Sequence, residues 1–220
     1  MHLLFLGAPG SGKGTQAKLL AERHGLAHVA PGDIFRQEIR AKSELGLLVE
    51  SILAKGALVD DDTTLRIIEK SLSSAGEASF VLDGFPRNMA QAQALDKMLC
   101  AKGQKMDLVV NLVVAEDKIF DRARSRRVCS ACGKPYSLAV QPPKVSGVCD
   151  ICGSELAIRK DDREETVLDR LSVYHRVTEP LEAYYQSQSL LASVDGEGEV
   201  EVVAARIERE IRARNLLVRQ

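Results

Sequence analysis

The sequence predicts an α/β protein with a parallel sheet covered by helices on both faces, one helical insert and one compact cysteine-containing segment. Three observations support this prediction. Short apolar runs alternate with stretches of helical periodicity, a glycine-rich loop follows the first run, and two C-x-x-C pairs lie in a stretch rich in proline and glycine. Strands that alternate with helices form parallel sheets, because each crossover helix covers a face of the sheet.

The elements of the core follow in order along the chain. Leu3 to Leu6 form the first apolar run and predict a strand, and Lys13 to His24 predict a helix because their small and apolar residues recur at helical positions. Later elements are expected as a strand at 80–82, a strand at 108–114, a strand closed by Val194 and an amphipathic helix at 200–215. The predicted core therefore comprises residues 1–29, 61–125 and 162–220.

Two segments interrupt this alternation. Residues 30–60 have helical patterns over 33–40 and 45–54 with no strand between them, which predicts a helical insert. Residues 126–161 hold the paired cysteines, several prolines and several glycines, which predicts a small β-rich module, called here the lid segment. A continuous helical pattern then resumes from Glu164 to Gln188.

Composition limits the partners of the chain. Its 220 residues are 45% hydrophobic and 28% charged, which is ordinary for a globular protein. A net charge of -1 and an aromatic content of 4% argue against binding nucleic acid by bulk charge or by base stacking. No segment approaches the roughly 20 apolar residues of a membrane span, and the apolar N-terminal run is too short for a signal peptide. We therefore expect no nucleic-acid partner, no membrane anchoring and a cytoplasmic location.

The glycine-rich loop reads G-A-P-G-S-G-K-G-T from Gly7 to Thr15 and matches the G-x-x-x-x-G-K part of the P-loop pattern. Glycines let backbone N–H groups turn toward phosphate oxygens, and the following helix start and the Lys13 ammonium add positive charge. One departure is that Gly14 stands where the pattern has Ser or Thr. The residues expected to bind a nucleoside triphosphate are Gly10, Ser11, Gly12, Lys13, Gly14 and Thr15.

Four of the five cysteines form the pairs Cys129-x-x-Cys132 and Cys149-x-x-Cys152, with 16 residues between the pairs. This spacing is typical of a structural zinc site in which four thiolates saturate a tetrahedral ion. Iron fits the same ligands, and two disulfides or free thiols are further alternatives. Cys100 has no partner pattern and is expected to be a small buried residue.

The loop with glycine in the usual hydroxyl position resembles the nucleoside monophosphate kinases, the adenylate kinase family in particular. The matching segments run from residue 3 to about 195 and include GDIFR 32–36, LDGFPR 82–87, RRV 126–128, RKDD 159–162, EETV 164–167, RL 170–171 and YH 174–175. The resemblance implies a monomeric phosphotransferase that converts ATP and AMP into two ADP. It also implies direct in-line transfer with Mg²⁺, without a covalent enzyme intermediate.

The resemblance further implies roles for single residues. Arginine suits them because its planar fork binds phosphate oxygens bidentately. The implied AMP-binding residues are Pro31, Arg36, Gly84, Arg87, Gln91, Arg159 and Arg170. The implied catalytic residues are Lys13, Asp83, Arg87, Arg122, Arg126, Arg159 and Arg170, with Arg122 and Arg126 also binding ATP. Asp161 and Asp162 are expected to fix Arg159 or to pair with another arginine of the lid segment.

Four further residues concern the Mg²⁺ ion and the base of the monophosphate. Asp83 ends a strand at the carboxyl edge where parallel sheets bind ligands, and suits the water shell of Mg²⁺, with a turn cap as the alternative. Asp33 is an N-cap candidate and a weaker candidate for the Mg²⁺-linked network. Gln91 matches the family's adenine-reading glutamine, whose amide donates and accepts together. Pro31 replaces the usual threonine and has neither a hydroxyl nor an N–H group, so base selectivity stays open.

The lid segment coincides with the zinc-stabilised flap of long-lid family members, which keeps water away from the transferring phosphoryl group. Alternatives within the class are a kinase of another nucleoside monophosphate and a GTP-dependent AMP kinase. Alternatives from other classes are a zinc-ribbon nucleic-acid-binding protein with a vestigial P-loop and an ATP-binding regulatory protein without turnover.

Overall fold

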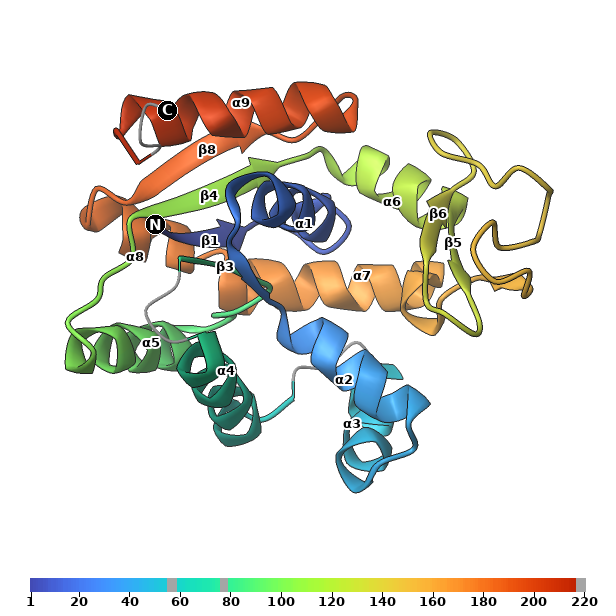
Figure 1. Cartoon of the computed structure of the whole chain (residues 1–220), viewed down its shortest axis with the longest axis horizontal. Coiled ribbons are helices and arrows are strands. Elements are labelled where there is room, and N and C mark those ends of the chain that lie inside the picture. The colour runs from blue at the N-terminus through green and yellow to red at the C-terminus, as the bar shows by residue number, and fades with distance from the viewer. Residues whose placement is uncertain (55–58, 76–78, 217–220) are drawn as a thin grey trace.

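The computed structural model describes residues 1–54, 59–75 and 79–216 of the chain. Residues 55–58 of the predicted insert, and 76–78 and 217–220 of the predicted core, lie outside the described residues. Five parallel strands form the central sheet in the order β2-β3-β1-β4-β8 (Figure 1). They are β1 (His2–Leu6), β2 (Ala27–Val29), β3 (Phe80–Asp83), β4 (Leu108–Val113) and β8 (Leu191–Asp195). The predicted α/β class is confirmed, while the short strand β2 was not predicted.

Each face of the sheet has its own apolar core, because successive strand residues point to opposite faces. Leu3 and Phe5 of β1 pack with helices α1 (Lys13–His24) and α9 (Val200–Ala213). Leu4 and Leu6 pack on the other face with α4 (Asp61–Ala75), α5 (Met89–Ala101) and α8 (Leu181–Ser187). The carboxyl ends of β1 and β3 consequently lie side by side, with Phe5 in register with Asp83.

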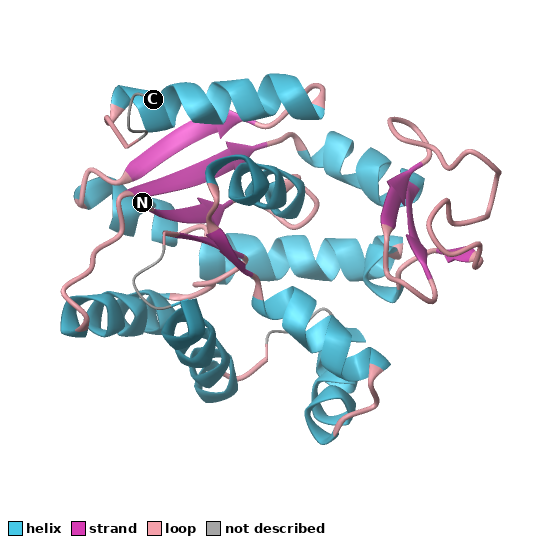
Figure 2. Cartoon of the chain, in the orientation of Figure 1, coloured by secondary structure: helices cyan, strands magenta, loops and turns pink. Residues whose placement is uncertain are grey.

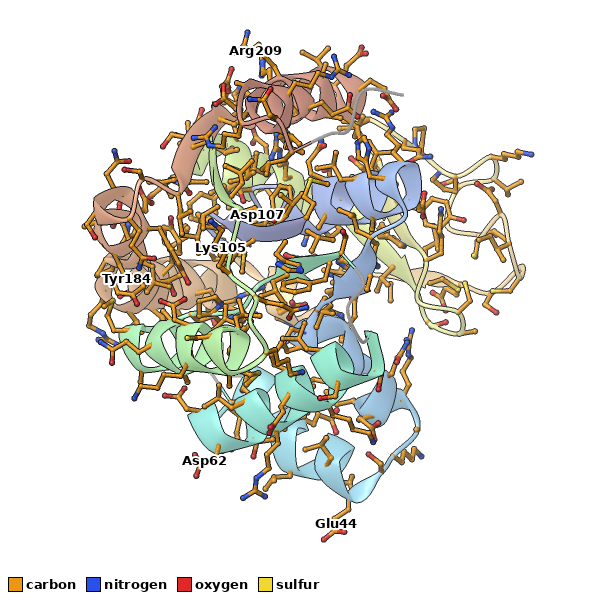
Figure 3. The ribbon with its side chains drawn as sticks, turned by 60° about the vertical axis from the view of Figure 1, so that its left-hand side comes forward. Glu44, Asp62, Lys105, Asp107, Tyr184 and Arg209 are labelled. Carbon is orange, nitrogen blue, oxygen red and sulfur yellow. The ribbon has the colours of Figure 1, made fainter. Side chains whose placement is uncertain are left out.

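Helices α2 (Pro31–Arg40) and α3 (Glu44–Ala54) project from the sheet beside α4 (Figure 1). A small cluster of Phe35, Val49 and Val59 joins this part of the chain. A Cβ added to Gly46 would overlap the backbone of Glu38, so α2 and α3 approach each other at a position that only glycine allows. Figure 3 shows Glu44 of α3 and Arg209 of α9 at opposite ends of the molecule.

The lid segment contains a second, antiparallel sheet of three strands in the order β6-β5-β7 (Figure 2). They are β5 (Arg126–Cys129), β6 (Pro135–Ser137) and β7 (Leu156–Ala157). Its apolar cluster consists of Cys129, Tyr136, Cys149 and Leu156. Helix α6 (Glu116–Ser125) leads into this sheet, and the 3₁₀ turn η1 (Lys160–Asp162) and helix α7 (Glu164–Val173) lead out of it.

Three local expectations from the sequence are wrong. The helix expected over 164–188 is divided into α7, a π-helical turn (Tyr174–Thr178) and α8, with Pro180 as the residue before α8. Asp33 is not an N-cap, because α2 begins at Pro31, whose fixed φ and missing N–H suit the first helical position. Cys100 is exposed rather than buried, because α5 turns Leu95 and Leu99 toward the core and leaves the next residue outside.

None of the helices in the described part of the chain is both long and apolar enough to cross a membrane.

Candidate active site

The loop between β1 and α1 has the backbone of an anion cradle. Gly7, Gly10 and Gly12 have φ values of 131°, 89° and 99°, a region that L side chains rarely adopt. A Cβ on Gly7 would lie 2.5 Å from the carbonyl oxygen of Leu112 on β4, so this glycine also lets the loop pass close to the sheet. Helix α1 begins at Lys13, so its free N–H groups point toward the loop.

Lys13 folds back over the loop. Its Nζ donates to the carbonyl oxygens of Gly7 at 2.6 Å and Ala8 at 2.7 Å. Burial, together with the charges of Arg87, Arg170 and Arg126, lowers the pKa of Lys13 to about 7, although Asp83 opposes this shift. The ammonium is therefore held in a place where positive charge is disfavoured until an anion arrives.

Asp83 explains the unusual glycine of the loop. A Cβ on Gly14 would lie 3.0 Å from Oδ2 of Asp83, so the carboxylate occupies the space where other P-loop proteins place a hydroxyl-bearing side chain. His28 of β2 brings its Nε2 to 3.9 Å from the same oxygen. His28 could not be predicted from the sequence, because a single histidine on a three-residue strand has no distinctive pattern.

Arg36 of α2 is held by Asp33, whose Oδ1 accepts from Nη2 at 2.5 Å. Lys18 of α1 approaches the other carboxylate oxygen at 3.0 Å. Burial raises the pKa of Asp33, but the hydrogen bonds and charges of Arg36 and Lys18 outweigh it and hold the pKa at about 2. Asp33 thus remains ionised and ties the start of α2 to α1. Sequence reasoning missed Lys18, because the pairing depends on how the two helices pack.

Arg87 follows β3 and is fixed by its own turn. Its Nε donates to the carbonyl oxygen of Gly84 at 2.7 Å, and Gly84 adopts a φ of 72°. Burial and the charge of Arg170 together lower the pKa of Arg87 to about 10, although Asp83 opposes this shift. A guanidinium that is buried near another guanidinium requires a nearby anion to stabilise both charges.

The arginines at the ends of the lid segment are positioned by the two acids that follow Arg159. Arg126 donates to Oδ1 of Asp162 at 3.1 Å, and Arg170 of α7 donates to Oδ2 of Asp161 at 3.1 Å. Asp162 therefore pairs with an arginine of the lid segment, as expected, whereas Asp161 pairs with Arg170, which lies outside that segment. Burial and the charge of Arg36 lower the pKa of Arg159. The buried Nε of Arg159 has no hydrogen-bond partner among the described residues.

Arg122 of α6 connects the loop to the residues that follow β8. Its Nη1 donates to the carbonyl oxygen of Ser11 at 2.8 Å, and its Nη2 donates to that of Gly196 at 2.9 Å. A cavity of about 230 Å³ adjoins it, and its lining includes Lys118, Arg122, Ser137, Val140, Glu197 and Gly198. Sequence reasoning missed this cavity, because it forms where the lid segment, α6 and the residues after β8 meet.

Gln91 lies in the first turn of α5 and is 2% exposed. Its Oε1 accepts from the backbone N–H of Arg87 at 2.7 Å, and its Nε2 donates to Oδ1 of Asp61 at 2.7 Å. Asp61, the first residue of α4, was not predicted from the sequence. Pro31 is buried at the start of α2.

The four cysteines of the lid segment converge. Their sulfur atoms all lie within 4.8 Å of one another. The closest pairs are Cys129 with Cys152 at 3.4 Å and Cys132 with Cys149 at 3.6 Å. A disulfide would bring two sulfurs to about 2.05 Å, whereas an ion bound tetrahedrally at about 2.3 Å separates them by about 3.8 Å. The arrangement is consistent with a four-thiolate metal site and not with two disulfides.

A neighbouring hydroxyl supports this ligand set. Tyr136 lies 3.4 Å from the sulfur of Cys149, and its oxygen accepts from the N–H of Asp150 at 2.8 Å, so its own proton points to the sulfur. This hydrogen bond is the largest of several influences that together lower the pKa of Cys149 to about 6. A thiol that ionises readily near neutral pH suits metal binding, since the thiolate is the ligand.

The geometry as a whole suits polyphosphate chemistry. The structure brings the loop and Asp83 to one edge of the sheet. Arginines from α2, the turn after β3, α6, the lid segment and α7 lie at the same edge. Positive groups from separate elements repel one another there, and the Asp83 carboxylate offsets only part of that repulsion at Lys13 and Arg87. Such a site can bind several phosphate groups and stabilise the charge that moves between them.

Comparison with known proteins gives a consistent result. The sequence profile of the family described as "Adenylate kinase" matches residues 5–190. The chain is 46% identical over 204 residues to the adenylate kinase of Clostridium acetobutylicum, covering 92% of this chain and 95% of the relative. It is 45% identical over 201 residues to that of Caldicellulosiruptor saccharolyticus, covering 91% and 94%. It is 46% identical over 213 residues to that of Thermosipho melanesiensis, covering 96% and 100%.

Proposed function

The chain belongs to the adenylate kinase family and converts ATP and AMP into two ADP, and from this premise we propose how its own residues carry out the reaction. The transfer is direct and in line, between phosphates bound on the two sides of the Lys13 loop. The strongest support is that positive side chains crowd one edge of the sheet and destabilise one another. Burial lowers the pKa of Lys13 there, and so do the charges of Arg87, Arg126 and Arg170. Bound phosphates would remove that destabilisation, so binding energy is directed at the reacting groups.

ATP binds on the loop, with Gly10, Ser11, Gly12, Gly14 and Thr15 presenting backbone N–H groups to its phosphates. Lys13, Arg122 and Arg126 neutralise their charge. The base of ATP occupies the cavity beside Arg122, which lies next to Ser11 of the loop through a 2.8 Å hydrogen bond. The Asp83 carboxylate, which Gly14 allows to approach the loop, suits the water shell of a Mg²⁺ ion, which would supply charge neutralisation on the donor phosphates when bound.

AMP binds between α2 and the turn after β3. Arg36 and Arg87 hold its phosphate, with Gly84 allowing close approach, and Gln91 and Pro31 contact the base. Arg159 and Arg170 face both substrates and stabilise the phosphoryl group as it moves. This division supports a core of residues 1–29, 61–125 and 162–220, an AMP-binding insert of residues 30–60 and an ATP-covering lid of residues 126–161.

The four cysteines hold a structural Zn²⁺, with Fe²⁺ as the alternative. They fill all four positions of a tetrahedral site, so the ion stabilises the lid segment without an open position for chemistry. The enzyme acts as a monomer in the cytoplasm. The family assignment replaces the alternatives of a nucleic-acid-binding zinc ribbon and of an ATP-binding protein without turnover.

These assignments are tested with purified protein, Mg²⁺, ATP and a monophosphate, followed by ³¹P NMR. We expect an equilibrium mixture of ATP, ADP and AMP that forms only when AMP is present, and slower initial rates with CMP, UMP and GMP. Metal analysis is expected to give one zinc per chain. ADP formation without AMP would contradict the proposed two-substrate site. Faster turnover of another monophosphate would contradict the role given to Gln91.

A further inference from the structure

The side-chain amide of Gln91 is fixed at both of its polar ends. Oε1 accepts the backbone N–H of Arg87 and Nε2 donates to the carboxylate of Asp61, each at 2.7 Å. The side chain is 2% exposed, so water does not compete freely for these bonds. A base reaches this amide only after the elements packed over it separate.

The amide has one stable orientation. A flip by 180° would place Oε1 against the Asp61 carboxylate and Nε2 against the N–H of Arg87, so two hydrogen bonds would become two repulsive contacts. Asp61 cannot turn away easily, because Nδ2 of Asn88 donates to its two oxygens at 2.9 and 3.1 Å. Asn88 is fixed in turn as the N-cap of α5, where Oδ1 accepts the N–H of Gln91 at 2.8 Å.

The fixed amide keeps one N–H on Nε2 and one lone pair on Oε1 for a ligand. A 6-aminopurine matches this pair, because its ring N1 accepts and its 6-amino group donates. A 6-oxopurine has the opposite pattern, because its N1–H donates and its O6 accepts. Pro31 has neither a hydroxyl nor an N–H to add to the recognition, so selection between these bases depends more heavily on the amide.

We propose that Asp61 is a specificity-determining residue, which locks the Gln91 amide in the orientation that accepts adenine and rejects 6-oxopurines. The proposal rests on the proposed base-reading role of Gln91. Asp61 acts as a positioning residue, since its effect on the substrate passes through Gln91. The two purine classes differ at the edge that the locked amide would meet, so they report on the lock directly.

The test compares kcat/KM for AMP and for inosine monophosphate, with MgATP as the donor, in the wild type and in Asp61→Asn. The asparagine has nearly the same shape, and its amide can donate to a flipped Gln91. We expect the AMP preference to fall about tenfold or more, with lower kcat/KM for AMP and higher kcat/KM for inosine monophosphate. A gain with the second substrate is not expected from a merely structural defect.

Asp62→Asn is the matched control, because it removes the same charge from the next residue. Asp62 is exposed and labelled at the rim of the molecule in Figure 3. We expect this variant to keep the wild-type preference. Asn88→Ser is a second probe that keeps a capping oxygen but removes both bonds to Asp61, and we expect a smaller shift in the same direction.

Gln91→Ala separates the base-reading role of Gln91 from the orienting role of Asp61. If the preference for AMP collapses in Gln91→Ala but is unchanged in Asp61→Asn and Asn88→Ser, the lock is wrong while the base-reading role stands. If Gln91→Ala itself keeps the wild-type preference, the base-reading role is wrong and the lock falls with it. A shift in Asp61→Asn that Asp62→Asn reproduces would also overturn the proposal, because it would reflect charge alone.

Discussion

Binding of MgATP is expected to be accompanied by proton uptake at Lys13. Its pKa of about 7 in the free protein means that about nine-tenths of the molecules carry a neutral amine at pH 8, and about one-tenth at pH 6. Phosphate oxygens would add negative charge to that of Asp83, the carboxylate that raises the pKa of Lys13 in the free protein, so the pKa should rise well above 8. The expected uptake is therefore about 0.9 proton per ATP at pH 8 and about 0.1 at pH 6.

Titration calorimetry measures this uptake directly. The binding enthalpy is recorded in two buffers of different ionisation enthalpy, and the slope gives the number of protons exchanged. At pH 8 the phosphates of ATP are already ionised, so their own protonation does not contribute appreciably. The uptake should fall steadily as the pH is lowered from 8 to 6, because more of the Lys13 side chain is already protonated before binding.

Two variants identify the group that takes up the proton. Lys13→Arg keeps a positive charge but has no proton to gain near neutral pH, so its uptake should be near zero. Lys97→Arg makes the same change at an exposed position on α5 and should leave the uptake at the wild-type value. An uptake below about 0.2 at pH 8 in the wild type would refute the reasoning, because Lys13 would then be charged before ATP arrives. Equal uptake in Lys13→Arg would assign the proton to another group.

Three further predictions follow from the lid segment and the insert. Cys132→Ser should abolish stoichiometric metal binding and make the lid segment sensitive to protease, whereas Cys100→Ser should change neither metal analysis nor digestion. Burial raises the pKa of Asp162, so its ionised form destabilises the fold above that pKa. Asp162→Asn should therefore raise the temperature at which the protein is half unfolded near pH 7, and this gain should vanish as the pH falls toward 4. The same variant should lower kcat, because Arg126 loses its carboxylate partner. Gly46→Ala should lower the free energy of unfolding in urea by about 1–3 kcal/mol, because the added methyl group overlaps the backbone of α2.

Features encoded by neighbouring residues could be predicted from the sequence. Helix α1 has the predicted bounds, because Gly12 and Gly25 flank it with positive φ values and stop the helix at each end. The cysteine spacing likewise predicted the convergence of four sulfurs. Strand β2 was missed because it has three residues, and its place in the sheet is set by pairing with β3 rather than by a pattern of its own.

The parts of the site that could not be predicted depend on packing between distant elements. Lys18 reaches Asp33 across two helices, and Asp61 reaches Gln91 from α4 to α5. Neither pair has a fixed spacing in sequence, and each residue alone resembles an ordinary charged surface residue. The same holds for Cys100, whose exposure follows from the side of α5 that meets the core.

The composition of the lid segment gives a physical reason for a metal at this place. Its apolar cluster has four members, two of them cysteines, while Val140 and Ile151 are 70% and 67% exposed. A flap held together by apolar burial against the core would lose its shape whenever it lifted from the core. Bonds from the four thiolates to a metal would lie within the segment, so they would hold its shape in every position of the flap. The guanidinium of Arg40 on α2 also lies against Gly133, where an added Cβ would be 3.1 Å from its Cζ, so the rigid flap meets the insert directly. With a metal bound, a closing lid would therefore act on the proposed AMP-binding insert without a large apolar interface.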